Sequence, residues 1–262
     1  MPRYDADFIR TETGYAMTSA AEIVPRLIDL VSPASVVDVG CGGGGWLAVF
    51  GKHGVRDLQG LDGPWVDRAL LQIDPARFRA QDLSQPFDAG RSYDLALCLE
   101  VAEHLPARAA FQLVSSLTSL APVILFSAAI PHQGGTGHVN ERWQSWWAAL
   151  FARHDYLPVD GLRRHIWDNP RVSHWYCQNL LIYVDRARLE KFPRLAAEWA
   201  RTDPSMLDLV HPRMFELAET SIPRLAKRAL TMLPRVLRHL GQAAEQPLAL
   251  SSPVPAEPIT AE

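Results

Sequence analysis

The segment Ser35–Leu47, with the sequence SVVDVGCGGGGWL, restricts the possible folds more than any other part of the chain. A largely apolar strand runs into a cluster of glycines, and a helix is expected to follow near Trp46. Glycines remove side chains from such a turn, so that backbone N–H groups and the helix N-terminus can approach a ligand closely. A strand, a glycine-rich turn and a helix in this order indicate the ligand-binding corner of an α/β fold.

Short apolar runs recur after this segment and are separated by stretches long enough for crossover helices. This alternation predicts an α/β fold with a doubly wound, mostly parallel sheet and helices on both faces. A last strand is expected at Asn179–Val184, and a short third strand is expected before Asp82. The other runs are Val36–Val39, Leu58–Leu61, Tyr93–Leu99 and Val123–Ser127.

Two helices are expected from the spacing of their apolar residues. One covers residues 15–31, with Pro25 near its first turn. The other covers Asn140–His154, where four large apolar residues recur at intervals of three and four. We expect that stripe to face the core, in preference to an aromatic platform for a substrate. Its members are Trp143, Trp146, Trp147 and Leu150.

The chain divides into three parts by composition. Residues 1–185 form the expected catalytic domain, 186–245 a helical extension broken by prolines, and 246–262 a tail rich in Pro, Ala and Ser that is expected to be disordered. Within the extension, residues 222–240 combine apolar and cationic side chains as a basic amphipathic helix does. Such a helix can make peripheral contact with an anionic membrane or a protein partner, although packing against the core is the preferred interpretation.

The overall composition is that of an ordinary globular protein, with 48% hydrophobic and 21% charged residues among 262. The net charge of −3 provides no basic field, so nucleic acid is not expected as a partner. No apolar run approaches the roughly 18 residues that span a membrane, and nothing resembles a secretory signal. With three cysteines and no CxxC pair, we expect a cytoplasmic protein.

Carboxylates near the ends of successive predicted strands indicate which class of ligand the loop binds. Gly40, Gly42 and Gly45 satisfy GxGxxG, so the loop alone would also permit a dinucleotide enzyme. Asp38, two residues ahead of Gly40, would repel a pyrophosphate but attract a cationic group such as the amino group of a methionine moiety. Asp62 is placed to bond ribose hydroxyls in either kind of cofactor. These positions favour a sulfonium cofactor that carries a nucleoside.

The motifs in their order resemble those of class I S-adenosylmethionine-dependent methyltransferases. The resemblance covers residues 15–185 and rests on VVDVGCGGGGW, on Asp62 in GLDGPW, on QDL at 81–83 and on YDLALCLEVAEHL at 93–105. Two further phrases, FSAAIPHQGGTGHVNERW and IWDNPRVSHWYCQNLLIYV, are similar to a bacterial subgroup often associated with sugar or polysaccharide biosynthesis. The run Gly43–Gly45 departs from the pattern, because many relatives place a small polar residue and then a larger one there.

The resemblance implies a Rossmann-like sheet of seven strands with the last strand antiparallel, and S-adenosylmethionine as the cofactor. It implies that the ribose is bound by Asp62, and that Glu100, at the end of the fourth strand, lies on the cofactor side. It also implies that Asp82 and Leu83 flank adenine. The residues that would line the methionine part of the cofactor are Asp38, Gly40, Gly42 and Gly44.

The candidates for chemistry follow the fourth and fifth strands. His104 is a candidate general base, with Glu103 to orient it, although it can instead serve only to shape its turn. His138 lies in a glycine-rich loop, 132–141, whose mobility would suit a lid, and it is a second candidate base or substrate contact. A neighbouring cationic segment around Arg163 could meet an anionic or sugar acceptor, but a solvated loop is the preferred interpretation.

Glu100, Glu103, His104 and His138 also resemble the metal site of enzymes that methylate RNA 3′ ends. The composition shows no RNA-binding character, and the same positions occur in metal-independent methyltransferases. We therefore expect no metal.

Three functions remain open. The favoured one is O-methylation of a sugar, a glycan or another small hydroxylated acceptor. The second is a metal-dependent RNA 2′-O-methyltransferase, and the third is a non-catalytic subunit that binds S-adenosylmethionine and recruits a partner. Because acceptor pockets in this class are built from variable loops, the fold does not identify the acceptor.

Overall fold

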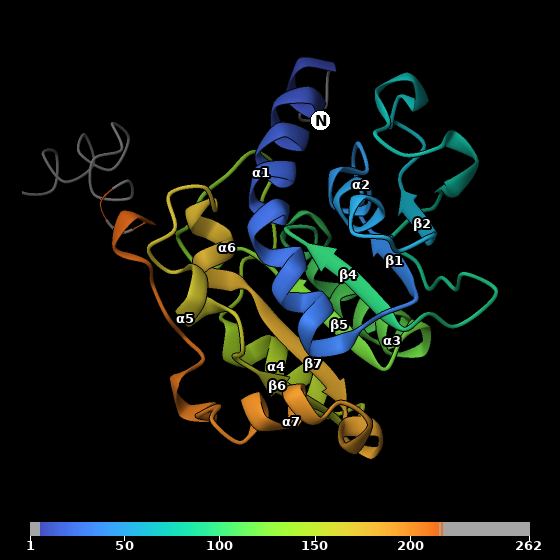
Figure 1. Ribbon diagram of the computed structural model, residues 1–262. Helices are drawn as coiled ribbons and strands as arrows, with labels where there is room; N and C mark the ends of the chain where they lie inside the picture. The colour runs from blue at the N-terminus through green and yellow to red at the C-terminus, as the bar shows by residue number, and fades with distance from the viewer. Residues whose placement is uncertain (1–5, 215, 217–262) are drawn as a thin grey trace, which may run out of the picture. The chain divides into compact units, whose positions relative to one another are not determined.

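A seven-stranded sheet forms the centre of the protein in the computed structural model, which describes residues 6–214 and 216 (Figure 1). The strand order is β3-β2-β1-β4-β5-β7-β6. Strands β1 to β5 are parallel to one another, whereas β7 runs antiparallel to both β5 and β6. The expected Rossmann-like class with an antiparallel last strand is confirmed. The strands are β1 Ser35–Val39, β2 Asp57–Asp62, β3 Phe78–Ala80, β4 Leu95–Leu99, β5 Val123–Ser127, β6 Tyr156–Val159 and β7 Leu181–Asp185.

Helices connect the strands and cover both faces of the sheet (Figure 1). The α-helices are α1 Ala6–Val31, α2 Gly45–Lys52, α3 Ala110–Leu120, α4 Gln144–Ala152, α5 Arg163–Ile166, α6 His174–Asn179 and α7 Pro193–Trp199. Short 3-10 turns occur at Arg68–Leu70, Pro75–Arg77, Ala102–His104 (η3), Ala107–Ala109, Arg186–Lys191 and Pro204–Met206.

The central strands are buried on both faces, and this explains why they read as unbroken apolar runs. In β4, Leu95, Leu97 and Leu99 pack into a core layer with residues of α1, α2, α5, α6 and α7. The alternate residues Ala96 and Cys98 pack into a second layer with α3 and α4. Because successive side chains of a strand point to opposite faces of the sheet, β4 contributes residues to both core layers.

Helix α1 begins at Ala6, well before residue 15, so Pro25 lies inside the helix and not near its first turn. The early part of the helix carries no apolar periodicity, and the sequence pattern therefore does not mark it. Its position follows from tertiary contact with the glycine-rich loop: a Cβ added at Gly43 would meet Thr13 at 2.4 Å, and one at Gly45 would meet Met17 at 2.9 Å.

The tryptophan stripe was predicted to face the core, and only half of it does. Helix α4 starts at Gln144, so Trp143 precedes the helix with extended backbone and is 39% exposed. Trp146 is 40% exposed beneath the guanidinium of Arg142, whereas Trp147 and Leu150 are buried. A residue adjacent to Trp147 is rotated by about 100° around the helix axis, which turns Trp146 away from the core.

The chain after β7 packs onto the same compact unit, which includes all the described residues. Leu195 of α7 joins the first core layer and Leu207 joins the second. The sheet itself ends at residue 185. The division of the chain at that residue stays a prediction. The predicted basic helix at 222–240 and the tail at 246–262 lie outside the described residues. Among the residues that the structure describes, no helix has the length and apolar character to cross a membrane.

Arg163 was expected in a solvated loop, but its side chain is buried. Its guanidinium forms an ion pair with Asp160, at 2.7 Å between Nη2 and Oδ2. The Nη1 group also donates hydrogen bonds to the carbonyls of Gln178 and Leu207. A buried cation is stable only when its donors are satisfied in this way. Arg163 therefore ties the segment after α7 to the end of α6.

Two tryptophans on α4 allow a direct test of the core assignment. Trp147→Ala should lower the free energy of unfolding by about 3–5 kcal/mol, because it removes a fully buried ring that packs on Phe126. Trp146→Ala, on the exposed side of the same helix, should cost about 1 kcal/mol or less. Urea denaturation at equal m-values measures both. Equal losses in the two variants would contradict the assignment.

Candidate active site

A cavity of about 510 Å³ lies where β1, β2 and β4 end. It is lined by the glycine-rich loop after β1, by the ends of β2 and β4, by the turn η3, by the loop around Gly134 and by parts of α1 and α6. This is the carboxyl edge of the sheet, where open α/β folds bind their ligands. The residues predicted for the cofactor and those predicted for chemistry therefore share one cavity.

The glycine-rich loop turns sharply at Gly40, whose φ is +86°. A Cβ at this position would stand 2.2 Å from Cγ2 of Val101, which no side chain tolerates. The amides of Gly40 and Cys41 both donate to the carbonyl of Leu61, which fixes the turn to the end of β2. The loop passes close to the turn after β4 only because Gly40 has no side chain.

Gly40, Gly42, Gly43 and Gly45 line the cavity, but Gly44 does not. Gly44 occupies the N-cap of α2 with φ +76°, and a Cβ there would approach Ile73 on the far side of the loop. The contact of Gly44 with the cofactor stays a prediction, and its neighbours Gly42, Gly43 and Gly45 are the glycines of this turn that line the cavity.

Asp38 is buried at the end of the cavity, with 2% of its surface exposed. Burial, reinforced by the carboxylate of Asp62, raises its pKa to about 8. Near neutral pH its protonated form is therefore favoured in the free protein, and a cationic group that enters the cavity favours the ionised form. This fits the predicted position beside the amino group of the methionine moiety.

Asp62 orders the loop before any ligand binds. Its two carboxylate oxygens accept hydrogen bonds from the amides of Gly42 (2.7 Å) and Gly63 (2.6 Å). It also lines the cavity, so the predicted contact with ribose is compatible with its position. Asp82 and Leu83 line the same cavity, and the hydrogen bonds that Asp82 accepts from Ser84 lower the pKa of its carboxyl. Their contact with adenine stays a prediction.

Glu100 follows β4 directly, with its backbone in the left-handed region at φ +54°. Its carboxylate accepts hydrogen bonds from Nδ2 of Asn179 (3.1 Å) and Nε2 of Gln133 (3.3 Å). Burial raises its pKa, and these hydrogen bonds partly oppose that shift. Neither partner was predicted, because both lie far away in sequence. Glu100 lines the cavity between the cofactor loop and the turn η3.

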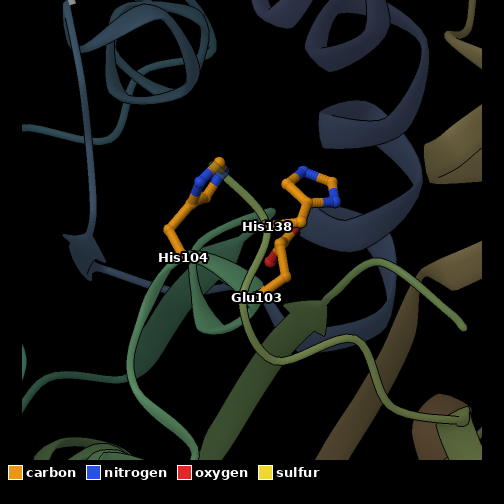
Figure 2. A group of neighbouring side chains, drawn as sticks. All are labelled: Glu103, His104 and His138. Atoms are coloured by element: carbon orange, nitrogen blue, oxygen red, sulfur yellow. The ribbon is translucent and has the colours of Figure 1, made fainter. Parts of the chain in front are cut away.

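Glu103, His104 and His138 form a cluster at one end of the cavity (Figure 2). One potential ligand atom from each residue lies within 4.8 Å of the others. The imidazole rings of His104 and His138 meet edge to face, with their centroids 4.9 Å apart. Glu103 is fully buried, and its carboxyl lies against the carboxyl of Glu100 and the backbone of Ala129. The three predicted catalytic residues thus come together.

The loop 132–141 is fastened to this cluster. The amides of Val139 and Asn140 donate to the carbonyl of Glu103. Glu141, which was not predicted, accepts from Nδ1 of His138 (3.2 Å) and from the amides of His132 and Gly134 (2.8 Å each). Glu141 therefore sets the orientation of His138, and the loop is held at both ends of its glycine run. The only sequence signal for the contact between Glu141 and His138 is that the glutamate follows the histidine by three residues.

Burial controls the protonation of the cluster. It lowers the pKa of His104 to about 4, with a contribution from neighbouring His138. It also raises the pKa of Glu103, and the nearby carboxyl of Glu100 raises it further. His104 is therefore neutral at pH 7. The cavity as a whole is acidic: six carboxylate residues line it and, among the lining residues that the structure describes, there is no Lys or Arg.

A family model for a methyltransferase domain matches residues 13–168, more than half of the 262 residues. The chain belongs to this family. The match covers the glycine-rich loop, Asp38, Asp62 and Asp82, and the cluster after β4. It confirms the expected S-adenosylmethionine-dependent methyltransferase. The cavity of this methyltransferase fits that cofactor, because a buried carboxylate and a glycine cradle lie where a cationic methionine moiety is expected. No protein of curated function matches the sequence.

Solved structures of methyltransferases share the fold. The sugar N-methyltransferase KedS8 from Streptoalloteichus sp ATCC 53650 is 16% identical, with a TM-score of 0.54 over 71% of this chain and 94% of its own. The S-adenosylmethionine-bound CalS10, an amino pentose methyltransferase from Micromonospora echinaspora, is 18% identical, with a TM-score of 0.47 over 71% and 99%. An O-methyltransferase family protein from Burkholderia thailandensis is 16% identical, with a TM-score of 0.42; the matched region covers 62% of this chain but only 55% of that one.

The raised pKa of Asp38 predicts that cofactor binding releases a proton. Below about pH 8 the free methyltransferase holds that proton, and a cationic ligand favours the ionised carboxylate. Affinity for S-adenosylmethionine should therefore rise with pH, by up to roughly tenfold per unit, and level off above about pH 8. Calorimetric titration in two buffers of different ionisation enthalpy measures the proton release.

Asp38→Asn is the control, since the amide cannot titrate and keeps the shape of the side chain. This variant should bind the cofactor more weakly and without the proton release that belongs to Asp38. The same pH dependence in both proteins would show that the proton comes from another group.

Proposed function

We propose that this methyltransferase transfers the methyl group of S-adenosylmethionine to a hydroxyl of a sugar, a glycan unit or another small neutral acceptor. The observation that carries this proposal is the cluster of Glu103, His104 and His138 in the same cavity as the glycine-rich loop. When bound, the cofactor supplies a methyl carbon on a sulfonium, whose sulfur leaves as a neutral thioether. Much of the rate then depends on the positioning and desolvation of the acceptor.

The cofactor would be held by residues on the β1–β2 side of the cavity. Asp38 would face the amino group of the methionine moiety, and the Gly40 turn would accept the chain of that moiety closely. Asp62, already fixed by the amides of Gly42 and Gly63, would present its remaining lone pairs to the ribose. Glu100 separates this side of the cavity from the histidine cluster.

An alcohol acceptor must lose its proton near the transition state, and the cluster suits that requirement. His104, with its pKa lowered to about 4, is neutral and can accept a hydrogen bond from the hydroxyl, although such a low pKa makes it a weak base. His138 is held by Glu141 and shares the edge of the same cavity. An amine acceptor would need less assistance, since its neutral form already carries a free lone pair.

The lining supports an acceptor whose reacting part carries no phosphate. The six carboxylates would repel anions, and no Lys or Arg stands among the described lining residues to offset them. Trp65, Trp175 and Tyr176 add aromatic surface to the wall, which suits the apolar face of a sugar ring. The same acidic lining disfavours RNA, whose binding depends on contacts between cationic side chains and phosphates.

The assignment of chemistry to the cluster is tested by His138→Ala. Turnover with a hydroxylated acceptor should fall at least about 100-fold, while affinity for S-adenosylmethionine should change by less than about twofold. The matched control is His132→Asn, in the same loop, because His132 does not line the cavity and asparagine tolerates its φ of +72°. Initial rates from a screen that begins with nucleotide sugars, together with calorimetry of cofactor binding, measure both effects.

Loss of cofactor binding in His138→Ala would contradict the assignment. Cofactor binding without turnover on any hydroxylated acceptor, together with a co-purifying protein partner, would favour the non-catalytic subunit. An acceptor that is methylated only on nitrogen would keep the methyltransferase but overturn the choice of oxygen.

A further inference from the structure

Tyr176 places a phenol in the wall of the cavity, between two tryptophans. The residue lies in α6, shortly before β7, and only 6% of its surface is exposed. Its ring meets that of Trp46 edge to face, with the centroids 5.3 Å apart and an angle of 82° between the planes. The centroid of Trp175 lies 6.0 Å from that of Tyr176. All three aromatic residues line the cavity.

The two indoles determine which hydrogen bond the hydroxyl of Tyr176 can still form. The N–H groups of Trp46 and Trp175 are hydrogen-bonded to the phenol oxygen, and both contacts act to lower the pKa of Tyr176. The buried N–H of Trp46 has no other partner among the described residues. Because two N–H donors occupy the lone pairs of the oxygen, the hydroxyl is left with one further bond, in which it donates its own proton.

This hydroxyl keeps its proton at neutral pH and has no acceptor in the protein. Burial raises the pKa of Tyr176, and the carboxyls of Glu100 and Asp38 raise it further, so both acids lie near the phenol. Within the described part of the chain, neither carboxyl accepts a hydrogen bond from Tyr176. Buried polar groups are almost always satisfied, so a donor that faces a cavity in this way indicates an acceptor atom in the ligand.

We infer that the hydroxyl of Tyr176 binds the carboxylate of the methionine moiety of S-adenosylmethionine, with Trp46 and Trp175 as positioning residues. That carboxylate is attached to the same carbon as the amino group expected beside Asp38, so the two groups enter the cavity together. Trp46 follows Gly45 at the start of α2, and its contact with Tyr176 keeps the phenol beside the glycine-rich loop. The hydroxyl therefore lies where the cofactor is expected, while the ring remains part of the aromatic wall.

The charge of the cavity favours a neutral donor for this carboxylate. Six acidic residues line the cavity, and the lining residues that the structure describes include no Lys or Arg to pair with an anion. The amide of Gly42 in the loop already donates to Asp62. A hydroxyl that donates to a carboxylate forms a charge-assisted hydrogen bond, which is stronger than a bond between neutral groups. Tyr176 supplies such a donor without a positive charge that would repel the sulfonium.

Two ligands that differ only in this carboxylate test the inference, and no acceptor is needed. Calorimetry with the full-length protein measures the dissociation constants of S-adenosylmethionine and of its decarboxylated form, which keeps the amino group and the sulfonium. Tyr176→Phe should weaken binding of S-adenosylmethionine at least about tenfold, because it removes a hydrogen bond to a charged group, and should change binding of the decarboxylated form less than about twofold. Tyr183→Phe, which removes a buried hydroxyl outside the cavity, should leave both constants unchanged.

The positioning role of Trp46 has its own test. Trp46→Phe keeps an aromatic ring but removes the N–H, so it should weaken binding of S-adenosylmethionine by roughly 3–10-fold and spare the decarboxylated form. Combined with Tyr176→Phe, it should add no further loss, because the indole acts through the phenol. Independent losses that add in the double variant would contradict this role.

Equal weakening of both ligands by Tyr176→Phe, or weakening of neither, would overturn the inference. Normal cofactor affinity with a raised KM for the acceptor would also overturn it, by assigning the hydroxyl to the acceptor. In the unaltered protein, S-adenosylmethionine should bind at least about tenfold more tightly than its decarboxylated form, which tests the inference without any variant. The inference rests on the cofactor and not on the proposed acceptor, so it stands even if nitrogen is methylated. Circular dichroism of each variant excludes a change of fold as the cause.

Discussion

The approach of Gly40 to Val101 is the constraint on which the site depends. Gly40 follows β1 and Val101 lies in the turn after β4, and a Cβ added at Gly40 would stand 2.2 Å from Cγ2 of Val101. Because these two residues are in contact, the glycine-rich loop expected to hold the cofactor lies next to the turn that carries Glu103 and His104. Transfer between two bound molecules requires their reacting atoms to lie within about 3–3.5 Å, and this contact brings the two halves of the site together.

The buried acids of the cavity are kept at a cost to the stability of the free protein. Asp38, Glu100 and Glu103 have pKa values raised by burial, and no Lys or Arg lines the cavity among the described residues. The fold can satisfy a buried charge where the role is structural, as the pair of Asp160 and Arg163 shows. Glu100 and Glu103 are instead hydrogen-bonded to each other, whereas Asp38 has the position that a cationic ligand group would complete.

The sequence predicts what depends on local pattern. Strands buried on both faces appear as apolar runs, and Asp38 and Asp62 follow from their spacing to the glycines. Features set by tertiary contact are not visible in that pattern. Gly44 lies against Ile73 at the N-cap of α2, Trp143 stays outside the helix because α4 starts four residues later than expected, and Trp146 turns outward because it is adjacent to the buried Trp147. Strand β6, Tyr156–Val159, is short and includes a proline, so it lacks a recognisable run. The role of Glu141 in orienting His138 depends on how the loop folds, and the sequence pattern does not show that conformation.

The last strand contributes to the site as well as to the sheet. Glu100 holds a left-handed backbone that a non-glycine residue adopts at a cost of roughly 1–3 kcal/mol, and such a conformation persists only where the surroundings fix it. Asn179, just before β7, and Gln133 supply that restraint through the Glu100 carboxylate. The antiparallel pairing of β7 with β5 places Asn179 beside the end of β4. The reversed strand therefore helps to hold the turn from which Glu103 and His104 project.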